Sequence, residues 1–145
     1  MLVGIGSDHG GYRLKEDIKQ YLAEKGIEFR DFGTHSTDSV DYPDISRAVA
    51  EAVAGAKCDR GIIICGTGIG VCIAANKVKG IRAALCHDTF SAQMSREHNN
   101  ANILTMGERV IGSGLARAIA EKWLATEFAG GRHAKRVCKI ADLEV

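Results

Sequence analysis

The stretch of sequence that decides the fold is Gly61-Ile62-Ile63-Ile64-Cys65-Gly66-Thr67-Gly68-Ile69-Gly70. Its first half is a run of β-branched residues, which predicts a buried strand of a parallel sheet. The strand ends on Cys65, and the chain then turns through three glycines into an apolar segment that predicts a helix. Because backbone N–H groups point outward at such a turn, it can bind an anion or stabilise a thiolate.

Strand-like and helix-like segments alternate along the whole chain. The predicted strands are Leu2–Ser7, Ile27–Phe32, Arg60–Cys65, Ile81–Leu85 and Ile103–Met106. The predicted helices are Gly11–Lys25, one beginning at Pro43, one from Gly68, Thr89–Glu97, Ser113–Glu127 and one from about Arg132 to the end. This order predicts an α/β fold with a five-stranded parallel sheet, helices on both faces, right-handed crossovers and an extra C-terminal helix.

Two of these helices show a clear apolar side. In the first, Leu14, Ile18, Tyr21, Leu22 and Lys25 fall together, and Gly26 is the stop signal. In the long helix near the end, Leu115, Ile119 and Trp123 share one face.

Composition excludes several classes of protein. The 145 residues fit one domain, residues 1–145, with a sizeable core. A net charge of +1 and 6% aromatic residues argue against nucleic-acid or membrane-surface binding. We expect neither a signal peptide nor a transmembrane helix, because no apolar run is long enough. Five cysteines without a C-x-x-C pair fit reduced thiols in a cytoplasm, and not a zinc site or disulfide framework.

Polar residues follow three of the predicted strands, as Ser7-Asp8-His9, Cys65-Gly66-Thr67 and Cys86-His87-Asp88. Ligands of open α/β sheets bind beyond the carboxyl ends of the strands. Cys65 is the leading candidate for a reactive group, because it opens a glycine-rich helix entry. The alternative is a buried structural thiol, which is how we interpret the other four cysteines where they are not at the surface.

The glycine turns could instead belong to a dinucleotide-binding motif. That motif requires G-x-G-x-x-G, but Val71 occupies the position of the third glycine in one turn and His9 occupies it in the other. Asp31 does stand where a ribose-binding acid would, and no Walker lysine follows either turn. The phosphate or oxyanion interpretation is therefore preferred.

Three further motifs are ambiguous when taken alone. Asp8-His9 is either a helix cap or a ligand-side pair in which the histidine donates to phosphate. His98-Asn99 is typical of an ordinary helix C-terminus. Arg132 and Arg136 share one helix face after a double glycine, so they either hold an anion or form a solvated basic face.

Together these motifs resemble the type B ribose-5-phosphate isomerases, within the sugar-phosphate isomerase family that includes galactose-6-phosphate isomerase. The matching segments extend over almost the whole chain in the family's order. They are residues 7–11, 41–44, 64–70, 74–77, 80–83, 95–99 and 130–133.

The resemblance implies a Rossmann-like, three-layer domain of flavodoxin-like strand order. It also implies a homodimer or tetramer whose active site lies at the subunit interface, with residues from both subunits. The ligand would be a small-molecule sugar phosphate, with no metal and no cofactor. Some family members use a glutamate on the following helix in place of the cysteine. Ala75 and Asn76 occupy that region here, so the chain resembles the family members that use the cysteine.

The resemblance also implies roles for individual residues. Cys65 would remove a proton from the sugar carbon, Thr67 would assist proton movement between the oxygens, and the backbone of Gly66, Gly68, Ile69 and Gly70 would form the anion hole. His98, assisted by Asp8, would open the furanose ring. His9, Arg132 and Arg136 would hold phosphate, with Arg109 a further candidate, and Tyr42 and Asn99 would line the sugar site.

The predicted reaction joins an aldose phosphate to its ketose through an enediolate, in the non-oxidative pentose phosphate pathway for ribose 5-phosphate. It needs a base, an oxyanion site and a phosphate clamp, and the sequence offers a candidate for each. The alternatives are an isomerase of six-carbon sugar phosphates or free aldoses, a non-catalytic nucleotide- or flavin-binding module, and a thiol redox protein. The last lacks a resolving cysteine.

Overall fold

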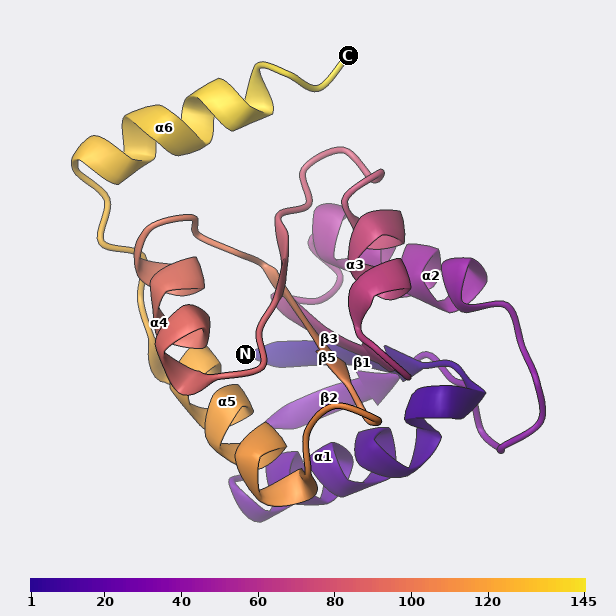
Figure 1. The fold of residues 1–145 in the computed structure, drawn as a ribbon. Coiled ribbons are helices and arrows are strands. Elements are labelled where there is room, and N and C mark those ends of the chain that lie inside the picture. The colour runs from indigo at the N-terminus through magenta and orange to yellow at the C-terminus, as the bar shows by residue number, and fades with distance from the viewer.

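The computed structural model describes residues 1–145 as a five-stranded sheet with helices on both faces (Figure 1). The strands are β1 (Leu2–Ser7), β2 (Glu28–Asp31), β3 (Arg60–Cys65), β4 (Ala83–Leu85) and β5 (Ile103–Gly107). The helices are α1 (Tyr12–Glu24), α2 (Tyr42–Ala54), α3 (Ile69–Ala75), α4 (Thr89–Glu97), α5 (Ser113–Ala125) and α6 (Arg132–Ala141).

All neighbouring strands are parallel, and their spatial order is β2-β1-β3-β5-β4. The winding reverses between β1 and β3, which gives the flavodoxin-like switch point. The predicted fold class, including the extra C-terminal helix, is confirmed. The β1, β3 and β5 strands therefore end side by side at the edge where a ligand is expected.

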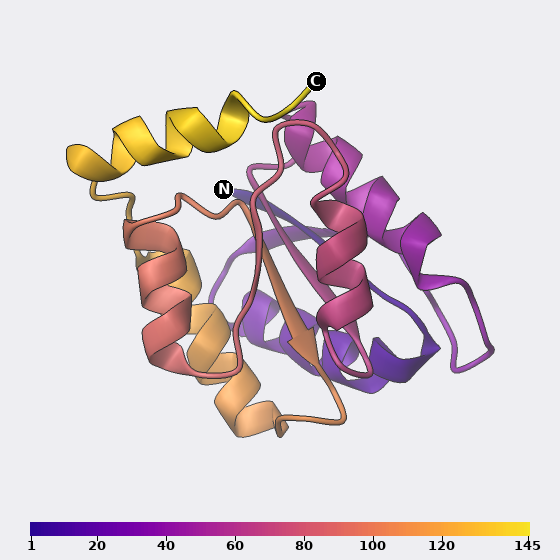
Figure 2. The same cartoon turned by 45° about the horizontal axis from the view of Figure 1, so that its top comes forward.

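The sheet separates two cores because alternate residues of each strand point to opposite faces. On β3, Ile62 and Ile64 join a core shared with α1 and α5, whereas Ile63 and Cys65 join a core shared with α2 and α3. Figure 2 shows α4 and α5 on one side of β5 and α2 and α3 on the other. Burial on both faces explains why the central strand is a continuous apolar run.

The C-terminal helix α6 stands apart from this body in both views (Figures 1 and 2). None of its residues is buried, and the apolar side chains of Ile140 and Leu143 are exposed. Residues 126–131 connect it to α5 along the end of α4, where the amide of Ala129 donates to the carbonyl of Glu97 at 3.0 Å.

Several predicted boundaries and faces differ from the structure. Strand β4 begins at Ala83 and not at Ile81, because Ile81 packs into the core beneath α2 and α3. Helix α1 begins at Tyr12 because residues 9–11 form a separate 3-10 turn. Leu115 was grouped on one face with Ile119 and Trp123, but it is 42% exposed whereas they are fully buried. Lys25 is the exposed residue that caps the end of α1. Each helix is either too short or too polar to span a bilayer.

Candidate functional site

Cys65 lies at the carboxyl end of β3 with only 5% of its surface exposed. Its Sγ accepts a hydrogen bond from the amide of Gly68, at 3.1 Å. Gly68 adopts a φ of +77°, and a Cβ at this position would lie 2.6 Å from Leu85 Cδ1 and 2.7 Å from the carbonyl carbon of Met106. Only glycine fits both this backbone conformation and this space, so the turn that places the amide on the sulfur requires it.

The rest of the turn presents polar groups beside the thiol. Thr67 is exposed, and its Oγ1 accepts from the amide of Ile69 at 3.2 Å. None of the turn's hydrogen bonds uses the amides of Gly66 or Thr67. These two amides can therefore donate hydrogen bonds to an oxyanion next to the sulfur.

Asp8 and His9 follow the neighbouring strand β1. Asp8 Oδ1 accepts from the amides of Gly10 and Gly11, at 2.9 and 3.2 Å, and so caps the 3-10 turn, while Oδ2 takes part in neither bond. His9 Nδ1 accepts from the amide of Val40 at 3.2 Å. Because an amide can only donate, Nδ1 is unprotonated in this arrangement and the ring proton resides on Nε2. His9 can thus donate to an anion.

Tyr42, the first residue of α2, and Arg109, in the turn after β5, complete this group. A Cβ on Gly70 would lie 2.6 Å from Tyr42 Cζ, so the tyrosine ring lies directly against the glycine turn. The backbone amide of Arg109 donates to the carbonyl of Gly66 at 3.0 Å. A Cβ on Gly66 would lie 3.1 Å from Nη1 of Arg109, so the guanidinium also lies against the glycine turn. We call the whole set the carboxyl-edge cluster: Asp8, His9, Tyr42, Arg109 and residues 65–70. A pocket of about 510 Å³ opens beside Asp8, His9 and residues 39–44.

The remaining predicted residues, together with His133, form a second group, the α4–α6 cluster: His98, Asn99, Arg132, His133 and Arg136. They line a pocket of about 320 Å³ between the end of α4 and α6. The rings of His98 and His133 are stacked, with centroids 4.2 Å apart and an interplanar angle of 10°. Arg132 and Arg136 share a face of α6, as predicted from their spacing.

The α4–α6 cluster is positively charged. Desolvation, and then the charges of His98, Arg132 and Arg136, lower the pKa of His133. A phosphate bound here would be attracted by the same two guanidinium groups. The sequence reasoning gave His133 no role. In the structure it lies in the first turn of α6, next to Arg132, and stacks on His98.

Arg96 holds the segment that follows α4. Its Nη1 donates to Asn100 Oδ1 at 3.0 Å and to the carbonyl of Ala101 at 2.5 Å, and its Nε donates to the carbonyl of Thr126 at 3.1 Å. Burial lowers the pKa of Arg96 to about 10. The guanidinium therefore binds together the two segments that flank His98, the end of α4 and the connection to α6.

The two clusters lie at opposite edges of the sheet. Helix α4 runs back from the carboxyl end of β4, so His98 reaches the edge where the strands begin. There the carbonyl of Asn99 accepts from Nε of Arg82, the residue that precedes β4, at 3.1 Å. Figures 1 and 2 agree, because α6 and the N-terminus lie on the side away from residues 9–11. One chain therefore does not bring the predicted site residues together.

The structure also tests the dinucleotide-binding interpretation. The Asp31 carboxylate is occupied by Lys15 and Lys19, at 2.7 and 2.8 Å, so it is not available as a ribose-binding acid. Glu108, which the sequence reasoning missed, accepts from the amide of Leu14 at 2.7 Å and fixes the start of α1 beside Arg109. A set of three or more His, Cys, Asp or Glu placed to hold a metal ion does not occur.

Comparison with known proteins agrees with this arrangement of motifs. The family model described as Ribose/Galactose Isomerase matches residues 3–140. The chain is 49% identical to ribose-5-phosphate isomerase B of Escherichia coli, over 98% of this chain and 95% of that protein. It is 48% identical to D-erythrulose-4-phosphate isomerase of Pectobacterium atrosepticum, over 98% and 94%. The solved structure of ribose-5-phosphate isomerase B from Clostridium thermocellum is 61% identical and superposes with a TM-score of 0.98, over 99% and 97%.

The geometry around His87 predicts a pH-dependent stability. Burial lowers the pKa of His87, and its Nε2 accepts from the amide of Gly107 at 2.9 Å, a bond that needs the neutral ring. The stabilisation is complete above the ordinary histidine pKa of about 6.5 and is lost as the pH falls toward the lowered value. We expect the free energy of unfolding to fall as the pH is lowered below about 6.5.

The control is His87→Gln, whose amide oxygen can accept the same bond without titrating. Denaturant unfolding at a series of pH values should show a weaker pH dependence in this variant. Identical pH profiles for the two proteins would contradict the role given to His87.

Proposed function

The chain belongs to the ribose/galactose isomerase family, and we propose that it interconverts ribose 5-phosphate and ribulose 5-phosphate. The observation that supports this most is the placement of Cys65: a thiol hydrogen-bonded by a glycine turn, beside Asp8, His9 and Arg109. Candidates for the base, the oxyanion donors and two of the phosphate-binding groups, His9 and Arg109, thus follow neighbouring strands. This is the set of groups that an aldose–ketose isomerisation requires.

In the proposed mechanism, the Cys65 thiolate takes the proton from C2 of the open-chain aldose. The electron pair forms the C1–C2 double bond of an enediolate, whose negative oxygen is stabilised by the amides of residues 66–70. Thr67 moves a proton between the oxygens on C1 and C2. The thiol then returns its proton to C1, which yields the ketose. No atom is gained or lost in the cycle.

Ribose 5-phosphate is mostly a closed ring, so ring opening must precede proton transfer. We assign this step to His98, assisted by Asp8, whose Oδ2 takes no part in capping the 3-10 turn. His9, Arg109, Arg132 and Arg136 would hold the phosphate, while Tyr42 and Asn99 would line the sugar. The stacking of His98 on His133 supports the assignment. The contact uses the face of the His98 ring, so both ring nitrogens of His98 can still bind the substrate.

The active site is proposed to form between two chains. Cys65 and His98 lie at opposite edges of one sheet, yet the mechanism needs both around a single sugar. In a homodimer with twofold symmetry, the α4–α6 cluster of each chain can meet the carboxyl-edge cluster of its partner, which makes two equal sites. The exposed apolar side chains of Ile69, Ile73 and Phe90 support burial in such a contact, and a tetramer would be a pair of such dimers.

Two further assignments accompany this function. We propose that residues 1–145 act as a single domain, since the family match extends over residues 3–140. We also propose a cytoplasmic location, because all five cysteines are unpaired, as they are in a reducing compartment.

A second candidate is an isomerase of other sugars, including six-carbon sugar phosphates and free aldoses. The family description includes galactose, and one relative is named for a four-carbon sugar phosphate. A panel of aldose phosphates and free aldoses distinguishes the candidates by kcat/KM.

The primary test is a coupled assay of ribose 5-phosphate conversion with EDTA present. We expect turnover to persist, and absent turnover with ribose 5-phosphate would refute the proposal.

Cys65→Ala should abolish isomerisation while leaving sugar-phosphate binding largely intact. Loss of a positioned base lowers kcat on the order of 10²–10⁴-fold, and the phosphate contacts remain. Steady-state kinetics and calorimetric titration with ribose 5-phosphate measure the two effects. Cys72→Ala, one turn into α3, is the control and should keep turnover close to that of the unmodified chain. Near-normal turnover in Cys65→Ala would remove the base assignment.

Arg132→Ala and Arg136→Ala should each raise KM for phosphorylated sugars more than they lower kcat. Each variant removes one guanidinium from the phosphate and leaves the carboxyl-edge cluster unchanged. Lys135→Ala removes an exposed positive charge from the same helix and should leave KM unaltered. If KM stays unchanged in both arginine variants, the phosphate is held elsewhere.

Mixed dimers test whether the site is shared. Cys65→Ala and His98→Ala should both be inactive alone. After joint unfolding and refolding, half of the dimers pair one variant with the other, and one of their two sites is intact, so about a quarter of the normal activity should return. Refolding each variant separately is the control. A mixture that remains inactive would mean that Cys65 and His98 act within one chain.

A further inference from the structure

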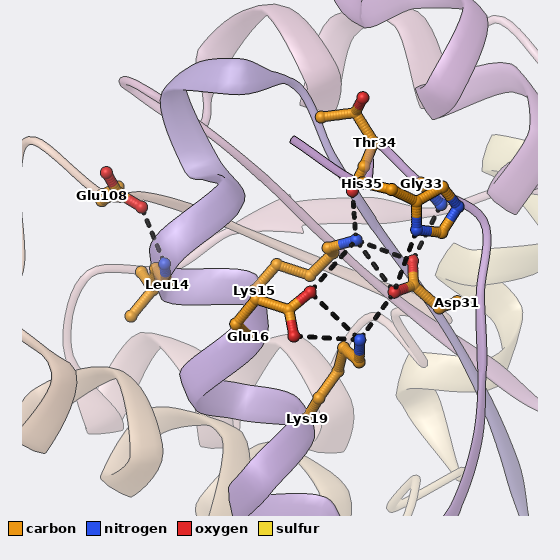
Figure 3. Close-up of polar contacts among 9 residues, drawn as sticks. All are labelled: Leu14, Lys15, Glu16, Lys19, Asp31, Gly33, Thr34, His35 and Glu108. Carbon is orange, nitrogen blue, oxygen red and sulfur yellow. Dashed lines mark hydrogen bonds and ion pairs between the residues drawn. The ribbon is translucent and has the colours of Figure 1, made fainter. Parts of the chain in front are cut away.

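A buried ion pair joins α1 to the end of β2, next to Gly33 and Thr34 (Figure 3). The side chain of Lys15, on α1, has an exposed fraction of 0%. Its Nζ donates to both oxygens of Asp31, at 2.7 and 2.9 Å, and to the carbonyl oxygen of Thr34, at 2.5 Å. The proposed mechanism uses none of these three residues.

The Asp31 carboxylate is held ionised by its neighbours. Lys19 Nζ lies 2.8 Å from Oδ2, and the amide of Gly33 donates to Oδ1 at 2.8 Å. Burial raises the pKa of Asp31, but the hydrogen bonds from Lys15, Lys19 and Gly33 outweigh it, so the pKa is lowered. A buried ammonium group is unfavourable unless it is paired and hydrogen-bonded, and here all its partners are present.

The carbonyl that Lys15 binds belongs to the loop joining β2 to α2. The amide of Thr34 donates to the carbonyl of Ser7 at 2.6 Å, while its own carbonyl accepts from Lys15. The start of the loop is thus fixed on the residue that precedes Asp8. At its far end the amide of Val40 donates to His9 Nδ1, and Tyr42 begins α2. Residues 35–39 between these anchors are exposed.

We propose that Lys15 is a positioning residue that orients His9 for phosphate binding by fixing the loop of residues 33–41. This proposal rests on the proposed function. The Lys15–Thr34 bond fixes one end of the loop, and the Val40 amide at the other end sets the His9 tautomer, which leaves Nε2 to donate to phosphate. Lys15 acts on the ligand only through this loop.

Stability alone does not explain a lysine at this place. Apolar residues often replace a buried ion pair without loss of stability, and Ile18 and Leu22 lie on the same stripe of α1 as Lys15. What an apolar residue lacks is a donor for the Thr34 carbonyl. Lys19 offers a matched comparison, because it binds the same Asp31 carboxylate but no loop atom and is 22% exposed.

The first test compares Lys15→Met with Lys19→Met. The Lys15 variant should raise KM for ribose 5-phosphate and the dissociation constant for inorganic phosphate, measured by calorimetry, each about tenfold, the loss of one charge-assisted hydrogen bond. Its kcat should change little, and Lys19→Met should leave both constants unchanged. Equal effects in the two variants, or loss of kcat with unchanged KM, would overturn the proposal.

The second test is a double-mutant cycle with His9→Asn. Asparagine keeps an acceptor near the position of Nδ1 and removes Nε2. If Lys15 acts through His9, Lys15→Met should raise KM no further in the His9→Asn background. A merely structural lysine would add its full effect there, and this result would refute the proposal.

Two measures keep the tests decisive. If Lys15→Met does not fold, Lys15→Met/Asp31→Asn removes the carboxylate charge left behind and still lacks the loop contact, so the same comparison applies. The phosphate dissociation constant needs no turnover. Suppose that the unmodified chain does not isomerise ribose 5-phosphate, but that Lys15→Met still raises the dissociation constant for inorganic phosphate. This result would refute the proposed function and support the positioning role.

Discussion

Because all five strands run in the same direction, every turn that follows a strand lies at one edge of the sheet. This constraint gathers the ends of β1, β3 and β5, and with them Asp8, Cys65 and Arg109, although they are far apart in the sequence. It also sends each helix back to the opposite edge, so His98, at the end of α4, is delivered away from the thiol. This geometry supports the proposal that two chains share one site.

Rigidity at the carboxyl edge comes from backbone contacts that tolerate no side chain. Gly68 must be glycine to bring its amide to the Cys65 sulfur, and the ring of Tyr42 occupies the space a side chain on Gly70 would need. The loop opposite this turn has no regular structure of its own, and the buried Lys15 anchors it. In our proposal, the orientation of His9 for phosphate binding therefore depends on the buried ammonium group of Lys15.

Much of this could be predicted from the sequence, because the relevant signals are local. The apolar run of residues 61–65 and the glycines after it predicted β3, the turn and the position of Cys65, and the four-residue spacing predicted a common face for Arg132 and Arg136. Leu115 is exposed although it shares a helix face with Ile119 and Trp123, because apolar periodicity does not say which side chains of a face reach the sheet. The sequence analysis did not single out Lys15, because a lysine carries no signal of burial on its own, although Ile18 and Leu22 share its stripe. The separation of the two clusters depends on strand direction and helix return, which no single motif encodes.

The central claim is that the thiol of Cys65 moves a proton between C2 and C1 through an enediolate. Isomerisation of ribose 5-phosphate in D₂O, followed by proton NMR of the ribulose 5-phosphate formed, tests it most directly, because a thiol exchanges its proton with solvent. The account predicts deuterium at C1 of the product, formed by the unmodified chain and not by Cys65→Ala. Product that retains all of the C2 hydrogen at C1, as a hydride shift would give, would contradict it.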